Sequence, residues 1–253
     1  MITIAIQCHN FQHRLSWMLS SLQNQIGAPD ITVDISCMKD AGTPTTEQIA
    51  AMYGSDRLHI NMHYYPIETL QYRGLTRNDA IKRCKTDWLL FADCDMVYHH
   101  EYFNKLMTEV AGILASNPSK ARCIFTAGRY SNDIDKANDM VHAEAYEAPI
   151  PHPWKRVDAR LNKIKRGNVG AGYFQLISMI HCAHEGYYVD PDNNRDHAWL
   201  DKWAKANSDR QFRRRIGNVC KLSRWLSRNQ IHINHNRDNG NGLRDPEHLT
   251  EQR

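Results

Sequence analysis

The chain has 253 residues, of which 42% are hydrophobic and 24% are charged, and this composition excludes a predominantly disordered protein. The longest apolar runs, such as residues 88–92, are far shorter than the roughly 18 residues that span a bilayer, so we expect no transmembrane segment. The residues after Met1 lack the basic region of a signal peptide. We therefore expect a cytoplasmic protein, peripheral at a membrane surface at most.

Seven cysteines are scattered along the chain without a C-x-x-C pair. An odd number of cysteines in a chain of this length favours reduced thiols over a disulfide framework, and it argues against structural zinc. Reduced thiols agree with the expected cytoplasmic location.

The formal net charge is +4, but it is unevenly distributed. Residues 155–166 carry +5 and residues 205–228 carry +7, so the rest of the chain carries −8. Basic stretches on an otherwise acidic chain suggest an anionic partner, such as a nucleic acid, a phospholipid or a nucleotide diphosphate. Solvated helix faces and loops produce the same pattern, and the sequence leaves both interpretations open.

The first hundred residues alternate between two hydrophobic periods. A period of two, or a short apolar run, predicts strands at residues 2–6, 31–35, 58–62 and 88–92. Helical spacing predicts helices at 15–26, from Thr43-Pro44 to about Tyr53, and at 76–85, the second with Thr43 as its N-cap and Pro44 at its first position. Repetition of strand and helix predicts a parallel sheet with right-handed crossovers and helices on both faces.

The pattern weakens in the second half of the chain. A helix is expected at 102–114 and a strand at 123–125, but residues 133–170 have few periodic apolar positions and suggest a long excursion over an active-site face. Order resumes at 173–180, followed by a helix at 195–206 and a strand at 231–235. We expect residues 237–253 to form a mobile tail.

Polar residues follow several of the predicted strands at the edge where ligands of such sheets gather. Asp93-Cys94-Asp95 comes directly after the apolar run 88–92. Two carboxylates one residue apart at a strand end can converge on a hard divalent cation that keeps open positions for phosphate oxygens. A D-x-D pair alone is a weak signal, and its position after a buried strand makes it a candidate metal site.

Three segments carry a resemblance to glycosyltransferase family 2. Residues 2–10 with the following helix resemble the opening of that family, residues 74–81 resemble its Ala-Arg-Asn helix, and residues 86–95 are similar to the strand that delivers its D-x-D. The resemblance covers residues 1–105 well and 167–205 loosely. It implies a GT-A fold, an α/β architecture with a mostly parallel, Rossmann-like sheet flanked by helices and an irregular acceptor-side segment.

The family is expected to fill the chain as a single domain. Residues 1–127 would form the half that binds the nucleotide sugar, residues 128–236 the half that binds the acceptor, and residues 237–253 the tail.

The resemblance also implies site residues and cofactors. Asp95 would ligate Mn²⁺ or Mg²⁺, and Asp93 would touch the ribose or the metal shell. Residues expected beside the nucleotide-diphosphate sugar are Gln7, His9, Asn10, Asp40 and Arg77. Asp40 occupies the place of the aspartate that reads uracil, which favours a UDP-sugar, although Cys37-Met38-Lys39-Asp40 departs from the usual Asp-Asp-Gly-Ser.

Inverting transfer needs a base that deprotonates the acceptor hydroxyl as it attacks. The family carries that base at a Glu-Asp pair about a hundred residues after D-x-D, and residues 195–201 occupy this position. Asp196 is therefore the expected base, with His197 as the alternative where the pair would continue. A structural reading of Asp196 is a capping carboxylate at a helix N-terminus.

Histidines offer further metal ligands. His232 and His235 flank the late strand, and their spacing points them to opposite faces, so one of the two can complete the metal shell. The groups at 181–184 and 99–101 are rich in histidine but lack further ligands at recognisable spacing, so we interpret them as structural. Trp154, among prolines, suits stacking on a sugar or base, or filling a surface groove.

The leading hypothesis is a metal-dependent, inverting glycosyltransferase that moves a sugar from a nucleotide-diphosphate donor to a hydroxyl of a glycan or glycolipid. An alternative is the same transfer to a hydroxylated nucleobase in DNA, with the stretches 155–166 and 205–228 contacting the nucleic acid. Nucleotidyl transfer is disfavoured because residues 7–10 contain no glycine. A non-catalytic module that binds nucleotide sugars or nucleic acid is the alternative of a different class.

Overall fold

The computed structural model describes residues 1–9, 11–39, 45–131, 148–160, 165–166, 173–182 and 212–233. The first half contains β1 (Ile2–Gln7), α1 (Gln12–Gln23), β2 (Ile31–Cys37), α2 (Thr46–Ala51), β3 (Leu58–Tyr64), α3 (Ile67–Gln71), α4 (Arg73–Arg83), β4 (Trp88–Ala92), β5 (Met96–Tyr98) and α5 (Tyr102–Ser116). The second half contains η1 (Pro118–Arg122), β6 (Ile124–Thr126), β7 (Tyr130–Ser131), α7 (Pro153–Arg160), β8 (Lys165–Arg166), β9 (Phe174–Ser178), α8 (Met179–Cys182), β10 (Val219–Lys221), α10 (Arg224–Arg228) and β11 (Gln230–His232).

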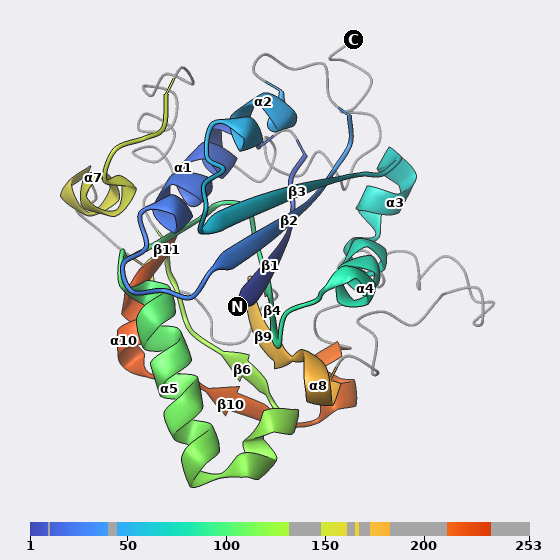
Figure 1. The fold of residues 1–253 in the computed structure, drawn as a ribbon, viewed down its shortest axis with the longest axis vertical. Helices are drawn as coiled ribbons and strands as arrows, with labels where there is room; N and C mark the ends of the chain where they lie inside the picture. Colours follow the sequence, from blue (N-terminus) through green and yellow to red (C-terminus); the bar gives the residue numbers. More distant parts are fainter. Residues whose placement is uncertain are drawn as a thin grey trace.

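A seven-stranded sheet forms the centre of the described structure, in the order β10-β6-β9-β4-β1-β2-β3 (Figure 1). The strand β1 pairs in parallel with both β2 and β4, and β2 pairs in parallel with β3. Only β9 runs against its neighbours, antiparallel to β4 and β6. The predicted mostly parallel α/β sheet is therefore confirmed, and the carboxyl ends of β1, β2 and β4 meet at one edge.

Helices cover both faces of this sheet, as the crossovers require. Figure 1 shows α1 and α5 on one side of the sheet and α4 on the other. The larger core cluster packs Leu19 of α1 and Phe103 of α5 against the sheet, whereas a second cluster packs Ile81 of α4 against Phe91. Burial on both faces explains why β4 reads as a continuous apolar run rather than an alternating one.

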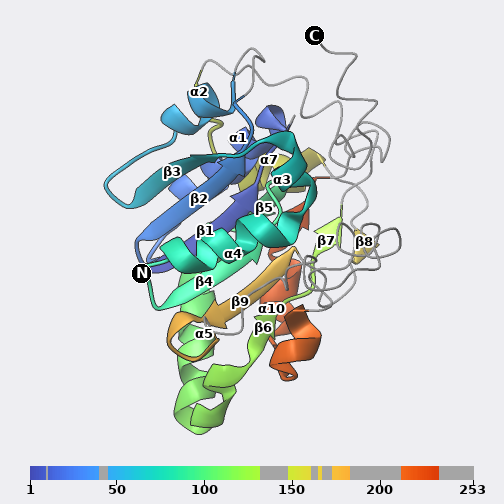
Figure 2. The ribbon, with the colours of Figure 1, turned by 90° about the vertical axis from the view of Figure 1, so that its right-hand side faces the viewer.

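A smaller sheet, in the order β5-β11-β7-β8, lies beside the main one (Figure 2). Its strands β5 and β11 pair antiparallel, with His232 opposite Met96. A third core cluster joins this sheet to α1 and α7 through Trp17, Val157 and Ile231. The sequence did not predict β5, because three residues are too few to show a period.

Two helix boundaries correct the sequence analysis. The N-cap of α2 is Thr45, not Thr43: its side chain accepts a hydrogen bond from the Gln48 N–H (3.1 Å), and the Gln48 side chain accepts one from the Thr45 N–H (2.8 Å). This reciprocal capping box satisfies two helix-end donors at once, so the helix begins after Thr45. The helix α4 begins at Arg73, earlier than the predicted residue 76, and follows α3 directly.

The segment predicted to be irregular contains the helix α7 and the short strand β8. The helix was missed because the preceding prolines suggest a loop, yet proline is accepted at a first helical position, where Pro153 lies. The predicted helix at 195–206 and the tail at 237–253 lie outside the described residues. The late strand is confirmed at Gln230–His232 and is shorter than predicted.

All seven cysteines lie among the described residues and are free thiols, as the sequence predicts. In the part of the chain that the structure describes, no helix has both the length and the apolar character that crossing a membrane requires.

Candidate active site

The candidate site lies where β1, β2 and β4 end. The Cys8 N–H donates a hydrogen bond to the Ser36 carbonyl (3.0 Å), so the ends of β1 and β2 stay side by side beyond the strands. Residues 93–95 leave β4 at the same edge before the chain enters β5. The D-x-D residues therefore occupy the position where parallel sheets bind their ligands.

Asp95 and His232 form the closest acid and base pair of the site. Asp95 Oδ2 lies 2.9 Å from His232 Nε2, and the two side chains are only 7% and 12% exposed. The pairing of β5 with β11 places them together, and the Ile233 N–H donates to the Asp95 carbonyl (2.9 Å) just beyond the pair. A buried carboxylate beside an imidazole is a donor pair that suits a divalent metal. The structure thus brings His232, a metal ligand expected from the sequence, next to Asp95.

Asp93 has different partners. Its Oδ1 lies 3.3 Å from Arg73 Nη1 and its Oδ2 lies 3.6 Å from Arg129 Nη1, and the carboxylate is one-quarter exposed. The ligand atoms of Asp93, Asp95 and His232 do not all lie within 4.8 Å of one another in the described structure. The two carboxylates of the D-x-D therefore face two environments, one with an imidazole and one with two guanidinium groups.

Arg129 follows β6 and extends the site toward the antiparallel strand β9. Its guanidinium carbon lies 4.0 Å from the centroid of the Tyr173 ring, a cation–π contact, and Nη1 lies 3.6 Å from Met96 Sδ. Burial raises the pKa of Tyr173, while the positive charges of Arg129 and Arg213 act in the opposite direction. Together with Arg73 of α4, these arginines give the site cationic groups from three separate segments of the chain.

Buried groups lie beneath the D-x-D. Burial lowers the pKa of Arg14, and the negative charge of Asp95 opposes this shift, so this first-turn arginine of α1 lies close enough to compensate the carboxylate. A hydrogen bond with Cys8, together with burial, raises the pKa of the Cys94 thiol well above its usual value. Cys94 is consequently a neutral, buried group between two carboxylates.

A family model decides what this arrangement is related to. Residues 3–116 match the model of Glycosyl transferase family 2, and the match runs from β1 to the end of α5. This part of the chain is therefore similar to glycosyl transferase family 2. The D-x-D pair, Arg73 and Arg77 lie inside the family 2 segment, whereas Arg129, Tyr173 and His232 lie beyond it.

Solved structures extend the likeness of fold to the rest of the chain. The crystal structure of S. aureus TarS aligns with 11% identity and a TM-score of 0.55, over 96% of this chain and 38% of that one. TarS 1–349 in complex with UDP aligns at 12% identity and 0.54, over 96% and 62%, and its complex with UDP-GlcNAc at 11% and 0.52, over 92% and 58%. The chain thus spans less than two thirds of these TarS chains, and the likeness shows the fold. No curated protein sequence matches this one significantly.

The other residues that the family resemblance singles out are placed as follows. Gln7 donates a hydrogen bond from Nε2 to the Leu70 carbonyl, and its Oε1 has no hydrogen-bond partner in the described structure. His9 is buried just past the end of β1. Arg77 is buried with its guanidinium carbon 5.3 Å from the centroid of the Phe91 ring. Asn10, Asp40, Asp196, His197 and His235 lie outside the described residues.

Arg14, Arg73 and Arg129 are site residues that the sequence does not predict. Arg73 is only four residues before Arg77, but no pattern in the sequence distinguishes an arginine that forms an ion pair from an arginine that faces solvent. Arg129 follows a three-residue strand whose neighbours come from distant parts of the chain. Local spacing contains no signal for such contacts, because long-range strand pairing creates them.

Proposed function

We propose that this chain is a metal-dependent, inverting glycosyltransferase that moves a sugar from a nucleotide-diphosphate donor, favoured as a UDP-sugar, to a hydroxyl of a glycan or glycolipid. The observation that carries the proposal is the pair Asp95–His232, together with the arginines around Asp93, at the carboxyl edge of a family 2 sheet. Structures of TarS with UDP and with UDP-GlcNAc share this fold and support the donor class.

Asp95 and His232 would hold the metal, Mn²⁺ or Mg²⁺. Their oxygen and nitrogen lie 2.9 Å apart on two paired strands, and this buried donor set fits a divalent cation. When bound, the ion would neutralise charge on the leaving diphosphate. Asp93 would contact the ribose or the metal shell, and His235 is the second C-terminal candidate ligand.

The arginines give the site a second means of handling phosphate. Arg73 and Arg129 both pair with Asp93, and guanidinium groups form strong, directional hydrogen bonds to phosphate oxygens. We infer that they orient the diphosphate of the donor, with Gln7, His9, Asn10 and Asp40 toward the nucleoside and Arg77 near the donor. In this arrangement residues 1–127 bind most of the donor. Residues 128–236 bind the acceptor and also contribute Arg129 to the diphosphate and His232 to the metal.

Asp196 is the proposed base, with His197 as the alternative. The base takes the proton of the acceptor hydroxyl while that oxygen attacks the anomeric carbon and the bond from this carbon to the diphosphate oxygen breaks. Attack opposite the leaving group inverts the anomeric configuration.

The roles of donor site and base separate in one variant. In Asp196→Asn we expect the donor to bind with unchanged affinity, because the amide keeps the shape of the side chain, while transfer to the acceptor falls about 100-fold or more. Calorimetric titration of the donor and an assay of nucleotide release measure the two effects. A fully active Asp196→Asn enzyme would move the role to His197, which the matched variant His197→Gln tests.

A panel of nucleotide-diphosphate sugars tests the function itself. We expect one donor to release its nucleotide in the presence of Mn²⁺ and of a hydroxyl acceptor, and NMR of the product to show the inverted anomer. No release with any donor would favour the non-catalytic binding module.

Transfer to a hydroxylated nucleobase in DNA is the second candidate. Residues 212–233 contain six basic and no acidic residues, with exposed Arg214, Lys221, Arg224 and Arg228. Such a surface suits a phosphate backbone, and binding to it would weaken steeply with salt. Transfer to DNA that carries a hydroxymethylated base, but not to oligosaccharides, would select this candidate.

Free thiols in all seven cysteines support the cytoplasm as the proposed location.

A further inference from the structure

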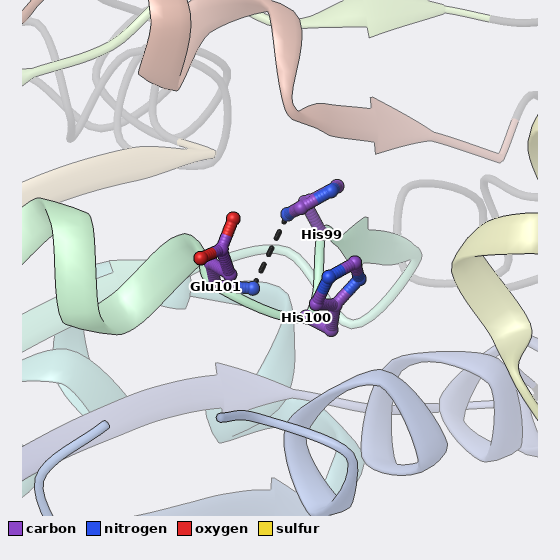
Figure 3. Close-up of side chains that lie close together, drawn as sticks. All are labelled: His99, His100 and Glu101. Carbon is purple, nitrogen blue, oxygen red and sulfur yellow. Dashed lines mark hydrogen bonds between the residues drawn. The ribbon is translucent and has the colours of Figure 1, made fainter. Parts of the chain in front are cut away.

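A second cluster of possible metal ligands lies where β5 passes into α5. His99, His100 and Glu101 each offer a ligand atom, and these atoms all lie within 4.8 Å of one another. They are the only group of three histidine, cysteine or acidic residues that meets this distance among the described residues. Figure 3 shows the two imidazole rings and the carboxylate drawn together at this turn.

The turn is held by hydrogen bonds to its backbone. The His99 N–H donates to the Asn229 carbonyl (3.0 Å), the Gln25 side chain donates to the His99 carbonyl (2.8 Å), and the Ile26 N–H donates to the His100 carbonyl (2.7 Å). These contacts come from the region after α1 and from the residue before β11. The backbone that carries His99 and His100 is therefore fixed before any ion binds, which lowers the cost of ordering these two ligands.

Aromatic rings form the walls of the cluster. The His99 ring meets Trp154 of α7 edge-on (centroids 5.4 Å apart) and Trp225 of α10 edge-on (5.5 Å), and it lies 3.9 Å from the His100 ring. All three ligand residues are half-buried. Apolar walls around a partly buried site restrict water and strengthen the bond between an ion and its ligands.

This cluster is separate from the candidate active site. Asp95 directly precedes β5 and His99 directly follows it, so the two lie at opposite ends of an extended strand, roughly 13 Å apart. No residue of the Asp95–His232 pair belongs to the cluster.

We propose that His99, His100 and Glu101 bind a divalent metal ion of the zinc class. Two imidazole nitrogens and one carboxylate oxygen are a donor set that zinc prefers over magnesium or calcium, and the fourth position would be left to water. Binding requires that both imidazoles are neutral. It also draws Glu101 away from Lys105, whose half-exposed side chain places Nζ 4.0 Å from Glu101 Oε1. The ion fixes His99 against Trp154 and Trp225, and so braces α7 and α10 on the β5–α5 turn.

Calorimetric titration with Zn²⁺ alone tests the site in the full chain. The background carries Asp95→Asn and His232→Gln, which disable the candidate active-site pair, so a failure of the proposed function leaves this test intact. We expect one Zn²⁺ per chain, an affinity at least about 100-fold weaker in His100→Gln, and no change in the matched control His181→Gln, an exposed histidine of α8. At saturating Zn²⁺ the melting temperature rises by roughly 5–10 °C.

Two further measurements distinguish a loss of the site from misfolding of the variant and from Zn²⁺ binding at another site. Glu101→Gln keeps the size of this half-buried side chain and should also weaken Zn²⁺ binding. Ni²⁺ should quench tryptophan fluorescence, and Trp154→Phe and Trp225→Phe should each remove part of that quenching. If His100→Gln and Glu101→Gln both bind Zn²⁺ as tightly as the background chain does, the zinc is bound by thiols such as Cys220 and the proposal is overturned. A background chain that binds no Zn²⁺ would also overturn it.

Discussion

The two aspartates of the D-x-D differ in what surrounds them, although one residue separates them. Asp95 is buried beside His232 with Arg14 close by, whereas Asp93 is more exposed and held between Arg73 and Arg129. The turn at residues 94–95 between β4 and β5 accounts for this difference, because in an uninterrupted extended chain two residues at this spacing would point to the same side. A metal ligand and a phosphate-binding cluster can therefore arise from three consecutive residues.

Arg129→Gln is the most informative change at the residue scale. We expect the KM for the donor to rise about 10- to 100-fold, because a guanidinium lost from a charge-assisted phosphate contact costs about 1.5–3 kcal/mol. Steady-state kinetics at saturating metal measure the effect. The matched control is Arg122→Gln, an exposed arginine of η1. An unchanged KM in Arg129→Gln would leave Arg129 with a structural role only.

The sequence was sufficient to find Asp93 and Asp95, because both follow an apolar run that is visible within ten residues. It also singled out His232 on the late strand, and the structure brings it to Asp95. Arg129 could not be found in this way, since its contacts with Asp93 and Tyr173 depend on β6 and β9 lying side by side. The catalytic assignment of Asp196 and His197 still rests on the family resemblance.

At the scale of elements, the first hundred residues were predicted more completely than the later ones, where the helix α5 and the strands β6 and β11 were found from the sequence but α7 was not. Strand and helix alternation fixes β1 to β4 locally, and β4 has the predicted bounds Trp88–Ala92. The short strands β5 and β7 carry no period of their own and form because each pairs with β11. The helix α7 was not predicted because the prolines before it suggest a loop. Its position is set by packing against α1 and β5.

Tyr53 links two such elements and gives a prediction on pH. The Ile150 N–H donates to the hydroxyl of Tyr53 (3.4 Å), which joins the end of α2 to the segment before α7. Burial raises the pKa of Tyr53 above its value of about 10 in the unfolded chain, so the stability that this group contributes is present below pH 10 and is lost as the pH rises through the folded pKa.

We therefore compare Tyr53→Phe with the parent protein by urea unfolding. At pH 7 the variant should be less stable by about 1 kcal/mol, because the Ile150 N–H loses its acceptor. Above pH 10 the parent should lose stability more steeply, by up to about 1.4 kcal/mol per pH unit, and the difference between the proteins should shrink. Parallel pH profiles would show that Tyr53 does not titrate with unfolding.

At the scale of the whole molecule, one sheet edge collects groups from nearly the full length of the described chain. Asp93 and Asp95 come from the family 2 segment, whereas Arg129, Tyr173 and His232 follow residue 116. We propose that Asp95 and His232 hold the metal through which the donor binds, and the chemistry of transfer depends on this pair.

Differential scanning fluorimetry with UDP-sugars, each with and without Mn²⁺, measures this metal-dependent donor binding in the parent protein and in Asp95→Asn. We predict a rise in melting temperature that requires both ligands in the parent and is absent in Asp95→Asn, whose melting temperature without ligands stays close to that of the parent. An equal, metal-dependent rise in Asp95→Asn would show that Asp95 does not hold the metal.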